Sequence, residues 1–318
     1  MSESKYGPIK LFAGTASAAL ANEISTYLGV PLSGRDIIRF PNDNLFVRLH
    51  ESVRGHDVFV IQTTSPPANE NLMELLITLD CLKRDSAGRI TAVVPYLAYS
   101  RSDRKDQPRV PITARLVADL IGVAGADRWM TIDLHAGQIQ GFFSIPGDEL
   151  SSFYLLSDYF AAKRLMNAVL VTADLGFAKK GRNFAARLGW PIAFVEKRRV
   201  GNQARSEVLT VVGDVSGKDV VIVDDEIDTA GSVSEAATVV RERGARDIYL
   251  ACVHGIFSPP ALPRLQELGA REIVTTNTVP TRPDKNIPNL TVLSVAPLLG
   301  EVIRRVHEGR SVGELFNE

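Results

Sequence analysis

The sequence predicts an α/β protein with two similar domains, each a mostly parallel β-sheet flanked by helices. At 318 residues the chain exceeds the size of one hydrophobic core, so two domains of about 150 residues are expected. Short β-branched runs bounded by Gly, Asp or Pro alternate with longer stretches of helical period, which is the pattern of βα units. Apolar residues make up 45% of the chain, which is typical of a globular interior.

The expected strands and helices follow one another in a regular order. The strands are the β-branched runs at residues 9–13, 58–62, 90–94, 129–132, 168–171, 220–223, 248–253 and 272–275. The helices carry apolar residues on one face, at residues 69–83, 113–123, 177–188, 232–243 and 296–307. The alternation restarts after residues 145–152, which contain Gly, Pro, Asp and Ser. We therefore expect domains at residues 1–148 and 149–318.

Composition excludes several kinds of partner. Lys and Arg number 36 against 37 Asp and Glu, so no overall field would attract nucleic acid or an anionic membrane. No apolar run approaches the roughly 20 residues that a bilayer span needs. The two cysteines, Cys81 and Cys252, lie in apolar stretches, which favours a reducing compartment over a disulfide framework or a cysteine-based metal site. The N-terminus lacks the apolar core of a signal peptide, so we expect a cytoplasmic protein that acts on small molecules.

Residues 220–232 combine a buried strand, two adjacent acids and a small-residue loop that opens a helix. The strand delivers Asp224 and Asp225 to the carboxyl edge of a parallel sheet, where paired carboxylates can accept hydrogen bonds from ribose hydroxyls or hold hydrated Mg²⁺. Residues 228–232 would then form a nest of backbone N–H groups suited to a phosphate. The alternative is an acidic strand end followed by an ordinary helix cap, with Asp228 or Thr229 as the N-cap.

This segment resembles the PRPP-binding motif shared by phosphoribosyltransferases and ribose-phosphate diphosphokinases (PRPP synthetases). The resemblance implies that Asp224 and Asp225 hold the ribose hydroxyls of ribose 5-phosphate. It also implies that the 5-phosphate is bound by the loop Asp228, Thr229, Ala230, Gly231 and Ser232.

Further stretches are similar to the diphosphokinases alone, and together they cover almost the whole chain. They are residues 51–60, 71–76, 89–114 and 133–143, the last reading Asp-Leu-His-Ala-Gly-Gln-Ile-Gln-Gly-Phe-Phe. The resemblance implies two phosphoribosyltransferase-like domains, with the nucleotide on the first and the sugar phosphate on the second. It also implies that the protein uses Mg²⁺ and moves the terminal diphosphate of ATP onto the anomeric hydroxyl of ribose 5-phosphate, giving AMP and PRPP.

The resemblance assigns a nucleotide site to residues whose types alone are ambiguous. The implied ATP-binding residues are Phe40, Asn42, Asn44, Arg101, Ser102, Asp106 and His135. His135 and Asp174 are the implied metal or phosphate ligands. Taken alone, His135 is better explained as a hydrogen-bonding core residue, since Mg²⁺ prefers oxygen ligands, and Phe40 as an ordinary core residue.

A charged stretch at residues 196–205 matches the mobile catalytic loop of this family. Lys197 and Arg199 fall on its two cationic catalytic positions. Phosphoryl-type transfer leaves little covalent chemistry to the protein, so positioned cations and Mg²⁺ are the expected source of rate. A charged stretch can also be only a solvated surface, but this one adjoins a candidate site.

Assembly and regulation follow only from the resemblance. Family members generally form dimers that stack into hexamers, and many bind phosphate and ADP at an interface site. That site corresponds here to Ser52, Arg54, Arg109, Ser311 and Phe316. A plain helix-end role for the C-terminal residues is the alternative.

Several positions depart from the commonest family residues. They are Asn44, Ser102, Phe177, Lys180 and Asn277. Asn44 and Ser102 belong to the expected adenine pocket, which leaves the choice of nucleotide donor open, and Phe177 would narrow the sugar-phosphate site. These departures are what a catalytically silent regulatory homologue would show, although its catalytic loop or acidic pair would also be interrupted, and both are intact. A phosphoribosyltransferase would need a hood domain and has no reason to retain residues 95–109.

Overall fold

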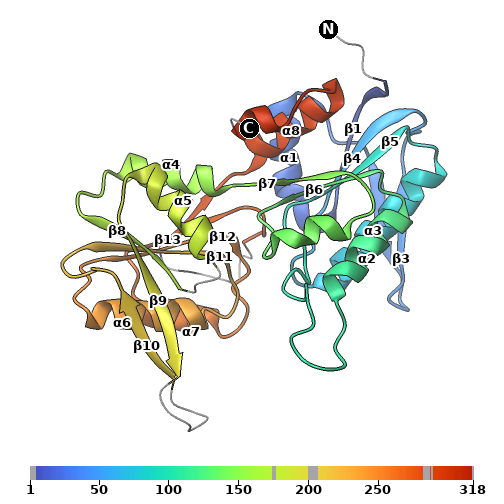
Figure 1. Cartoon of the computed structure of the whole chain (residues 1–318). Helices are drawn as coiled ribbons and strands as arrows, with labels where there is room; N and C mark the ends of the chain where they lie inside the picture. The colour runs from blue at the N-terminus through green and yellow to red at the C-terminus, as the bar shows by residue number, and fades with distance from the viewer. Residues whose placement is uncertain (1–4, 174–176, 200–206, 282–286, 288, 317–318) are drawn as a thin grey trace. The chain divides into compact units, whose positions relative to one another are not determined.

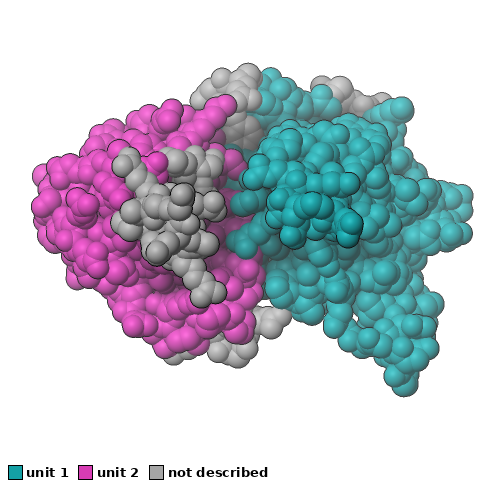
Figure 2. Space-filling model, turned by 60° about the horizontal axis from the view of Figure 1, so that its bottom comes forward, with its two compact units in different colours: residues 1–151, 278–280, 294–318 teal, residues 152–277, 281–293 magenta. Residues whose placement is uncertain are grey.

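The computed structural model describes residues 5–173, 177–199, 207–281, 287 and 289–316. The chain forms two compact units, shown in teal and magenta in Figure 2. Unit 1 comprises Met1–Ser151, Thr278–Pro280 and Ser294–Glu318, and unit 2 comprises Ser152–Asn277 and Thr281–Leu293. Within the described ranges, every helix is too short or too polar to cross a bilayer.

Unit 1 is built on a five-stranded sheet in which every neighbouring pair is parallel. In spatial order its strands are β1 (Gly7–Ala13), β4 (His56–Ile61), β5 (Arg89–Val94), β6 (Arg128–Ile132) and β7 (Gly147–Leu150). The middle strands are almost continuously apolar and buried, as expected for parallel strands covered on both faces. A separate antiparallel hairpin, β2 (Arg35–Arg39) and β3 (Leu45–Leu49), packs on helix α2.

Four helices cover unit 1, and they pack in pairs. Helix α2 (Ala68–Arg84) lies beside α3 (Thr113–Ala124), and α1 (Ala18–Leu28) lies beside α8 (Ala296–Glu308), as Figure 1 shows. Short 3-10 turns lie at Thr15–Ser17, Gly137–Phe142 and Gly313–Phe316. In the core, the Trp129 and Phe143 rings stack with centroids 4.3 Å apart.

Unit 2 is built on a seven-stranded sheet in which only β9 and β10 are antiparallel. In spatial order its strands are β10 (Glu207–Val212), β9 (Ile192–Arg199), β8 (Ala168–Thr172), β11 (Asp219–Ile227), β12 (Ile248–Gly255), β13 (Glu272–Thr276) and β14 (Leu290–Leu293). Helices α4 (Phe153–Lys163) and α5 (Ala178–Leu188) lie on one face, and α6 (Gly231–Glu242) and α7 (Ala261–Leu268) lie on the other (Figure 1). The predicted fold class, mostly parallel sheets flanked by helices, is confirmed.

Each strand and helix predicted from the sequence is present, with ends that differ by a few residues. The largest difference is β11, which was expected to end at Val223 and continues to Ile227 because it stays paired with β12 through Gly255. The sequence analysis missed the β2–β3 hairpin, the short edge strands β7 and β14, and helices α1, α4 and α7. It also expected a loop where β9 and β10 form a hairpin.

Helix α8 belongs to unit 1, whereas the sequence analysis placed it in a domain of residues 149–318. The boundary between the units therefore lies at Ser151 and Ser152, and the chain returns to unit 1 at its end. The physical reason is the contact between α8 and α1. Gly300 of α8 has no side chain, and a Cβ added to it would lie only 2.4 Å from the Tyr27 ring of α1. At the end of α8, His307 Nδ1 lies 2.8 Å from the buried Asp57 carboxylate, and Arg89 donates to the Val306 carbonyl oxygen.

Replacing Asp57 with Ala should destabilise unit 1 by about 3 kcal/mol, because it leaves the partly buried Arg89 guanidinium without its buried acceptor. Asp57 is fully buried and accepts from Arg89 Nε and Nη2 at 2.8 and 2.6 Å. Urea unfolding measures the change. The control is Asp119→Ala, which removes an exposed ion pair with Arg115 and should cost at most about 0.5 kcal/mol. Equal losses in the two variants would contradict a structural role for Asp57.

Candidate functional site

The two acids of the sequence motif lie at the carboxyl edge of the unit 2 sheet. Val220 to Val223 are at most 1% exposed, and Asp224 then aligns with Cys252 of β12. Asp225 is 6% exposed, and its backbone N–H donates to Asp224 Oδ1 at 2.9 Å. The strand end therefore holds two carboxylates in a largely buried setting.

This edge is also where the strand order of unit 2 reverses. From β8 the chain crosses to β9 on one side, and from β11 it crosses to β12 on the other side. Ligands of open α/β sheets bind in the crevice outside the carboxyl ends of the strands at such a switch point. Asp174, which follows β8 in the sequence, lies outside the described residues. The Asp224 pair is thus at the position in this topology best suited to a ligand.

The loop after β11 has the backbone conformation of an anion-binding nest. Ala230 adopts φ +60° and ψ 14°, a left-handed conformation that L-residues rarely take, and Gly231 begins α6. A left-handed residue followed by a helical one turns successive N–H groups toward one concave face. Thr229 and Ser232 are exposed beside it and Asp228 is half-buried. The sequence analysis expected this nest.

The alternative of an ordinary helix cap is wrong in its assignment. Ala230, not Asp228 or Thr229, is the N-cap residue of α6, and an alanine side chain cannot accept a hydrogen bond from the first turn. The first-turn N–H groups therefore lack the usual N-cap partner, which leaves them suited to an anionic ligand.

Phe177, which was expected to narrow this site, is a buried residue. Its side chain is 7% exposed, and its ring packs 5.3 Å from the ring of Phe153 in unit 2.

Cys252, beside Asp224 in the sheet, is also buried, and burial raises the pKa of its thiol to about 12. A thiol with that pKa is not a nucleophile at neutral pH.

In unit 1, three of the expected nucleotide residues lie in the turn between β2 and β3. Phe40 is 45% exposed, with its ring centroid 6.0 Å from that of Phe46, so the core role favoured by its residue type alone is wrong. The turn is closed by a 2.9 Å hydrogen bond from Phe40 N–H to the Asn44 carbonyl oxygen, and Asn44 N–H donates to Asn42 Oδ1 at 3.3 Å. An exposed aromatic ring beside two amides can pack against a purine base.

The other expected nucleotide residues follow the carboxyl ends of β5 and β6. Arg101, Ser102 and Asp106 lie in the connection from β5 to α3, and His135 follows β6. Because β5 and β6 are parallel neighbours, their carboxyl ends meet at one edge of the sheet. His135 is exposed, so the core role favoured by its residue type alone is also wrong.

Asp133 shapes the segment that carries His135. Its side chain is 2% exposed, it adopts φ +41°, and its Oδ1 accepts from Ser151 Oγ at 3.0 Å. Its N–H donates to the Leu150 carbonyl oxygen at 2.9 Å. A buried aspartate in this strained conformation turns the chain outward immediately after β6.

Ser102 has a structural contact that its sequence position did not indicate. Its hydroxyl accepts a long hydrogen bond of 3.4 Å from Thr113 N–H, and its carbonyl oxygen accepts from Ala114 N–H at 3.1 Å. Both contacts hold the beginning of α3, since the first N–H groups of a helix have no partner within it.

The two groups of residues that are expected to bind the nucleotide lie near the beginning of α2. Arg39, next to Phe40, forms an ion pair with Glu70 in the first turn of α2. Asn69, its neighbour, accepts a hydrogen bond from the Tyr99 hydroxyl in the connection that carries Arg101. The β2–β3 turn and the loop after β5 therefore lie around one helix end of unit 1. Glu70, Asn69 and Tyr99 were not named from the sequence, since they do not adjoin one another along it.

The expected catalytic cations lie on β9, a strand and not a loop at this point. Lys197 aligns with Leu209 of β10, and Arg199 aligns with Glu207. The remainder of the expected loop, residues 200–206, lies outside the described residues.

The described residues contain no group of three or more His, Cys, Asp and Glu side chains that could hold a metal ion. Asp224 and Asp225 supply oxygen ligands, which suit Mg²⁺, whereas the imidazole of His135 suits it poorly. These residues fit a magnesium ion that retains several of its water ligands and is coordinated mainly by phosphate oxygens. They do not fit a site in which protein side chains supply all the ligands.

The expected regulatory residues are not gathered within unit 1. Ser52 and Arg54 precede the amino end of β4, and the backbone of Arg54 forms an isolated antiparallel β-bridge with Ala87. Ser311 follows α8, where its carbonyl oxygen accepts from Arg305 at 2.8 Å. Arg109 lies in the connection from the carboxyl end of β5 to α3, whereas Ser52 and Arg54 come before β4. The backbone of Phe316 ends the last 3-10 turn.

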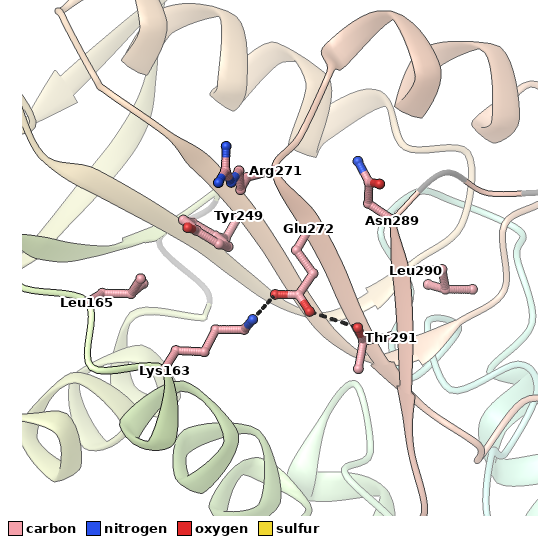
Figure 3. A pocket seen from close by; sticks show the side chains of 8 residues that line it. All are labelled: Lys163, Leu165, Tyr249, Arg271, Glu272, Asn289, Leu290 and Thr291. Atoms are coloured by element: carbon pink, nitrogen blue, oxygen red, sulfur yellow. Dashed lines mark hydrogen bonds and ion pairs between the residues drawn. The ribbon is translucent and has the colours of Figure 1, made fainter.

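A pocket of about 500 Å³ lies at the amino edge of the unit 2 sheet, opposite the Asp224 edge. Figure 3 shows Glu272 at its centre, bonded to Lys163 and Thr291, each at 2.7 Å. Tyr159 also donates to Glu272, at 2.5 Å. None of the residues expected to bind substrate line this pocket, and its central carboxylate is already neutralised, so we do not place a substrate there.

Comparisons with known proteins cover nearly the whole chain. Residues 9–125 match the family described as the N-terminal domain of ribose phosphate pyrophosphokinase, and residues 199–317 match the phosphoribosyl synthetase-associated domain. The ribose-phosphate pyrophosphokinase of Campylobacter jejuni is 48% identical over 96% of this chain and 98% of the relative. That of Clostridium acetobutylicum is 47% identical over 98% of both chains. The crystal structure of phosphoribosylpyrophosphate synthetase from Mycobacterium smegmatis aligns with a TM-score of 0.90 at 45% identity, covering 95% of this chain and all of that one.

Proposed function

Because this chain belongs to the ribose-phosphate pyrophosphokinase family, we propose that the loop from β11 to α6 holds its ribose 5-phosphate. The protein is a ribose-phosphate diphosphokinase: it converts ATP and ribose 5-phosphate to AMP and PRPP and so feeds nucleotide biosynthesis. Nothing in the comparisons favours a silent regulatory homologue, and the acidic pair that such a protein would interrupt is intact.

The observation that carries the sugar-phosphate site is the left-handed Ala230 between an acidic strand end and an uncapped helix. The N–H groups of residues 230–232 would bind the 5-phosphate, assisted by the hydroxyls of Thr229 and Ser232. Asp224 and Asp225 would accept hydrogen bonds from two neighbouring ribose hydroxyls, which orients the anomeric hydroxyl.

ATP would bind at the carboxyl edge of unit 1. Phe40 is placed to pack on adenine, Asn42 and Asn44 offer amides beside it, and Arg101 can pair with phosphate in a bidentate fashion. Asp106 and His135 add polar groups at the same edge. Ser102 is already bonded at the start of α3, so it would shape the nucleotide pocket through that helix end.

Magnesium would enter with the nucleotide, held by its phosphates and by water. Its chemistry is to neutralise charge on the phosphates that are transferred. Asp224 and Asp225 would offer carboxylate oxygens to its waters, while the family resemblance assigns His135 and Asp174 as ligands.

The transfer needs no protein nucleophile. The anomeric hydroxyl attacks the β-phosphorus, the bond from that phosphorus to the α-phosphate oxygen breaks, and AMP leaves with that oxygen. Lys197 and Arg199 would neutralise the charge that develops on the β-phosphate oxygens.

We further propose that the chain forms dimers that build a hexamer in the cytoplasm. The separation of Arg109 from Ser52, Arg54 and Ser311 supports this, because these residues could share one phosphate or ADP only if a second copy supplies part of the set. Phe316 would belong to the same interface.

With Mg·ATP and ribose 5-phosphate, the purified protein should release AMP and PRPP, and no ADP, because attack occurs at the β-phosphorus. Separating the nucleotides by chromatography measures this. ADP as the sole nucleotide product would indicate ordinary monophosphoryl transfer, and ribose 5-phosphate binding without any product would favour the silent homologue. Repeating the assay with dATP, GTP and CTP, with and without inorganic phosphate, determines the donor choice and the phosphate requirement.

A further inference from the structure

We propose that Arg264, on α7, is a positioning residue for the sugar phosphate: it holds residues 228–230 in the conformation that binds the 5-phosphate. This inference rests on the proposed ribose 5-phosphate site in unit 2. Its starting observation is a hydrogen bond of 2.9 Å from Arg264 Nη1 to the carbonyl oxygen of Thr229, in the middle of that loop.

The hydrogen bond fixes the direction of the next N–H group. The peptide between Thr229 and Ala230 is trans, and in a trans peptide the carbonyl and the N–H point in opposite directions. Holding the Thr229 carbonyl toward α7 therefore aims the Ala230 N–H away from α7. Because Ala230 is left-handed, this N–H is the first of the successive groups that form the nest.

The base of the loop is held by the same region of the chain. The Ile227 carbonyl oxygen accepts hydrogen bonds of 3.0 Å from the N–H groups of Ile256 and Phe257. Phe257 is buried and adopts φ +49°. The backbone of the connection from β12 to α7 is therefore hydrogen-bonded to the end of β11. Those contacts come from the backbone, so Arg264 on α7, which follows this connection, offers a side chain whose substitution can test how the loop is held.

Gly231 lies next to this arginine. A Cβ at Gly231 would lie 3.4 Å from Arg264 Nη1, which is ordinary van der Waals contact. The guanidinium therefore lies beside the first residue of α6 while it donates to the Thr229 carbonyl oxygen.

The electrostatic setting favours an anion. The N-terminus of a helix carries partial positive charge, so a guanidinium beside the start of α6 adds charge of the same sign. Glu235 and Glu267 line a pocket together with Arg264, so part of its charge is offset in the free protein. A phosphate bound at the nest would add an anion next to both positive groups, which favours ligand binding.

Arg264→Ala should raise the KM for ribose 5-phosphate and its calorimetric dissociation constant about 10- to 100-fold, the range for losing a hydrogen bond from a charged donor. The KM for ATP and kcat should stay within about threefold, because neither depends on the nest. Arg264→Lys, which keeps the charge and loses the planar fork, should recover part of the affinity. The control is Arg243→Ala, an exposed arginine at the far end of α6, which should match the wild type.

The inference is overturned if Arg264→Ala binds ribose 5-phosphate like the wild type, or if the ATP and sugar constants worsen together. An arginine with only a structural role would lower the unliganded melting temperature and kcat, so both are measured. Should Arg264→Ala fail to fold, wild-type affinity in Arg264→Lys would overturn the inference. Parallel calorimetry on Asp224→Ala and Asp225→Ala separates the two proposals. If these variants lose ribose 5-phosphate affinity and Arg264→Ala does not, the proposed sugar-phosphate site is retained and the positioning role of Arg264 is rejected. No loss in any of these variants rejects both.

Discussion

Replacing Lys197 or Arg199 with Ala should reduce kcat on the order of 10²- to 10⁴-fold while changing ATP affinity little. The reason is that the chemical step has no protein nucleophile, so cations aimed at the reacting phosphate supply most of the rate. Removing one of them would lose an interaction made mainly in the transition state, while the Phe40 and Arg101 region of unit 1, the proposed ATP site, would still hold the ground-state complex.

Steady-state kinetics with a separate measurement of ATP binding tests this result. The matched control is Arg198→Ala, which removes the same charge from the same strand at a position that the family does not use for catalysis. It should retain activity within about threefold, because Arg198 is not one of the two cationic catalytic positions that the resemblance implies. A kcat that survives in Lys197→Ala and Arg199→Ala would remove both from the mechanism, and an equal loss in Arg198→Ala would point to the strand and not to the two side chains.

The double substitution Asp224→Ala with Asp225→Ala should weaken ribose 5-phosphate binding about 10²- to 10⁴-fold, since two charge-assisted hydrogen bonds of about 1.5 to 3 kcal/mol each are lost. Asp224 and Asp225 lie at the end of the central strand β11, so their backbone is held by β12 on one side. The loss should therefore come from the missing carboxylates and not from a displaced loop.

Isothermal titration calorimetry with ribose 5-phosphate measures this change. Replacing both residues with Asn keeps an acceptor and removes the charge, so the loss should be smaller. Asp247→Ala is the control, because Asp247 precedes β12 at the opposite edge of the same sheet. Unaltered binding in the double Ala variant would move the sugar site elsewhere, and weakened binding in the control would indicate a general electrostatic effect.

The candidate site was predictable to different degrees in the two units. In unit 2 the acids and the loop are adjacent in sequence, so a buried run followed by Asp-Asp and a Gly-containing bend indicated the candidate site directly. In unit 1 the nucleotide residues come from a hairpin and two strand ends. Only the β-sheet order and the contacts of Glu70 and Asn69 bring them together.

Exposure could not be predicted from residue type. Phe40 and His135 are residues that usually lie in a core, and both are exposed. Phe177 was expected beside the sugar site and is buried against Phe153. These outcomes depend on neighbours that are far away in the sequence. Local patterns carry no information about them.

The sequence by itself determined the fold class, the eight strands and five helices that were predicted and are present, and the residue types of the β11–α6 loop. The spacing of hydrophobic residues and the positions of turn residues are local properties, so both can be identified within each stretch of sequence. Tertiary structure alone decided that α8 returns to unit 1, that Ala230 is the N-cap of α6, and that Arg264 reaches the Thr229 carbonyl. Each of these depends on which distant surfaces meet, and that is set by the packing of whole elements and not by the residues next to one another in the chain.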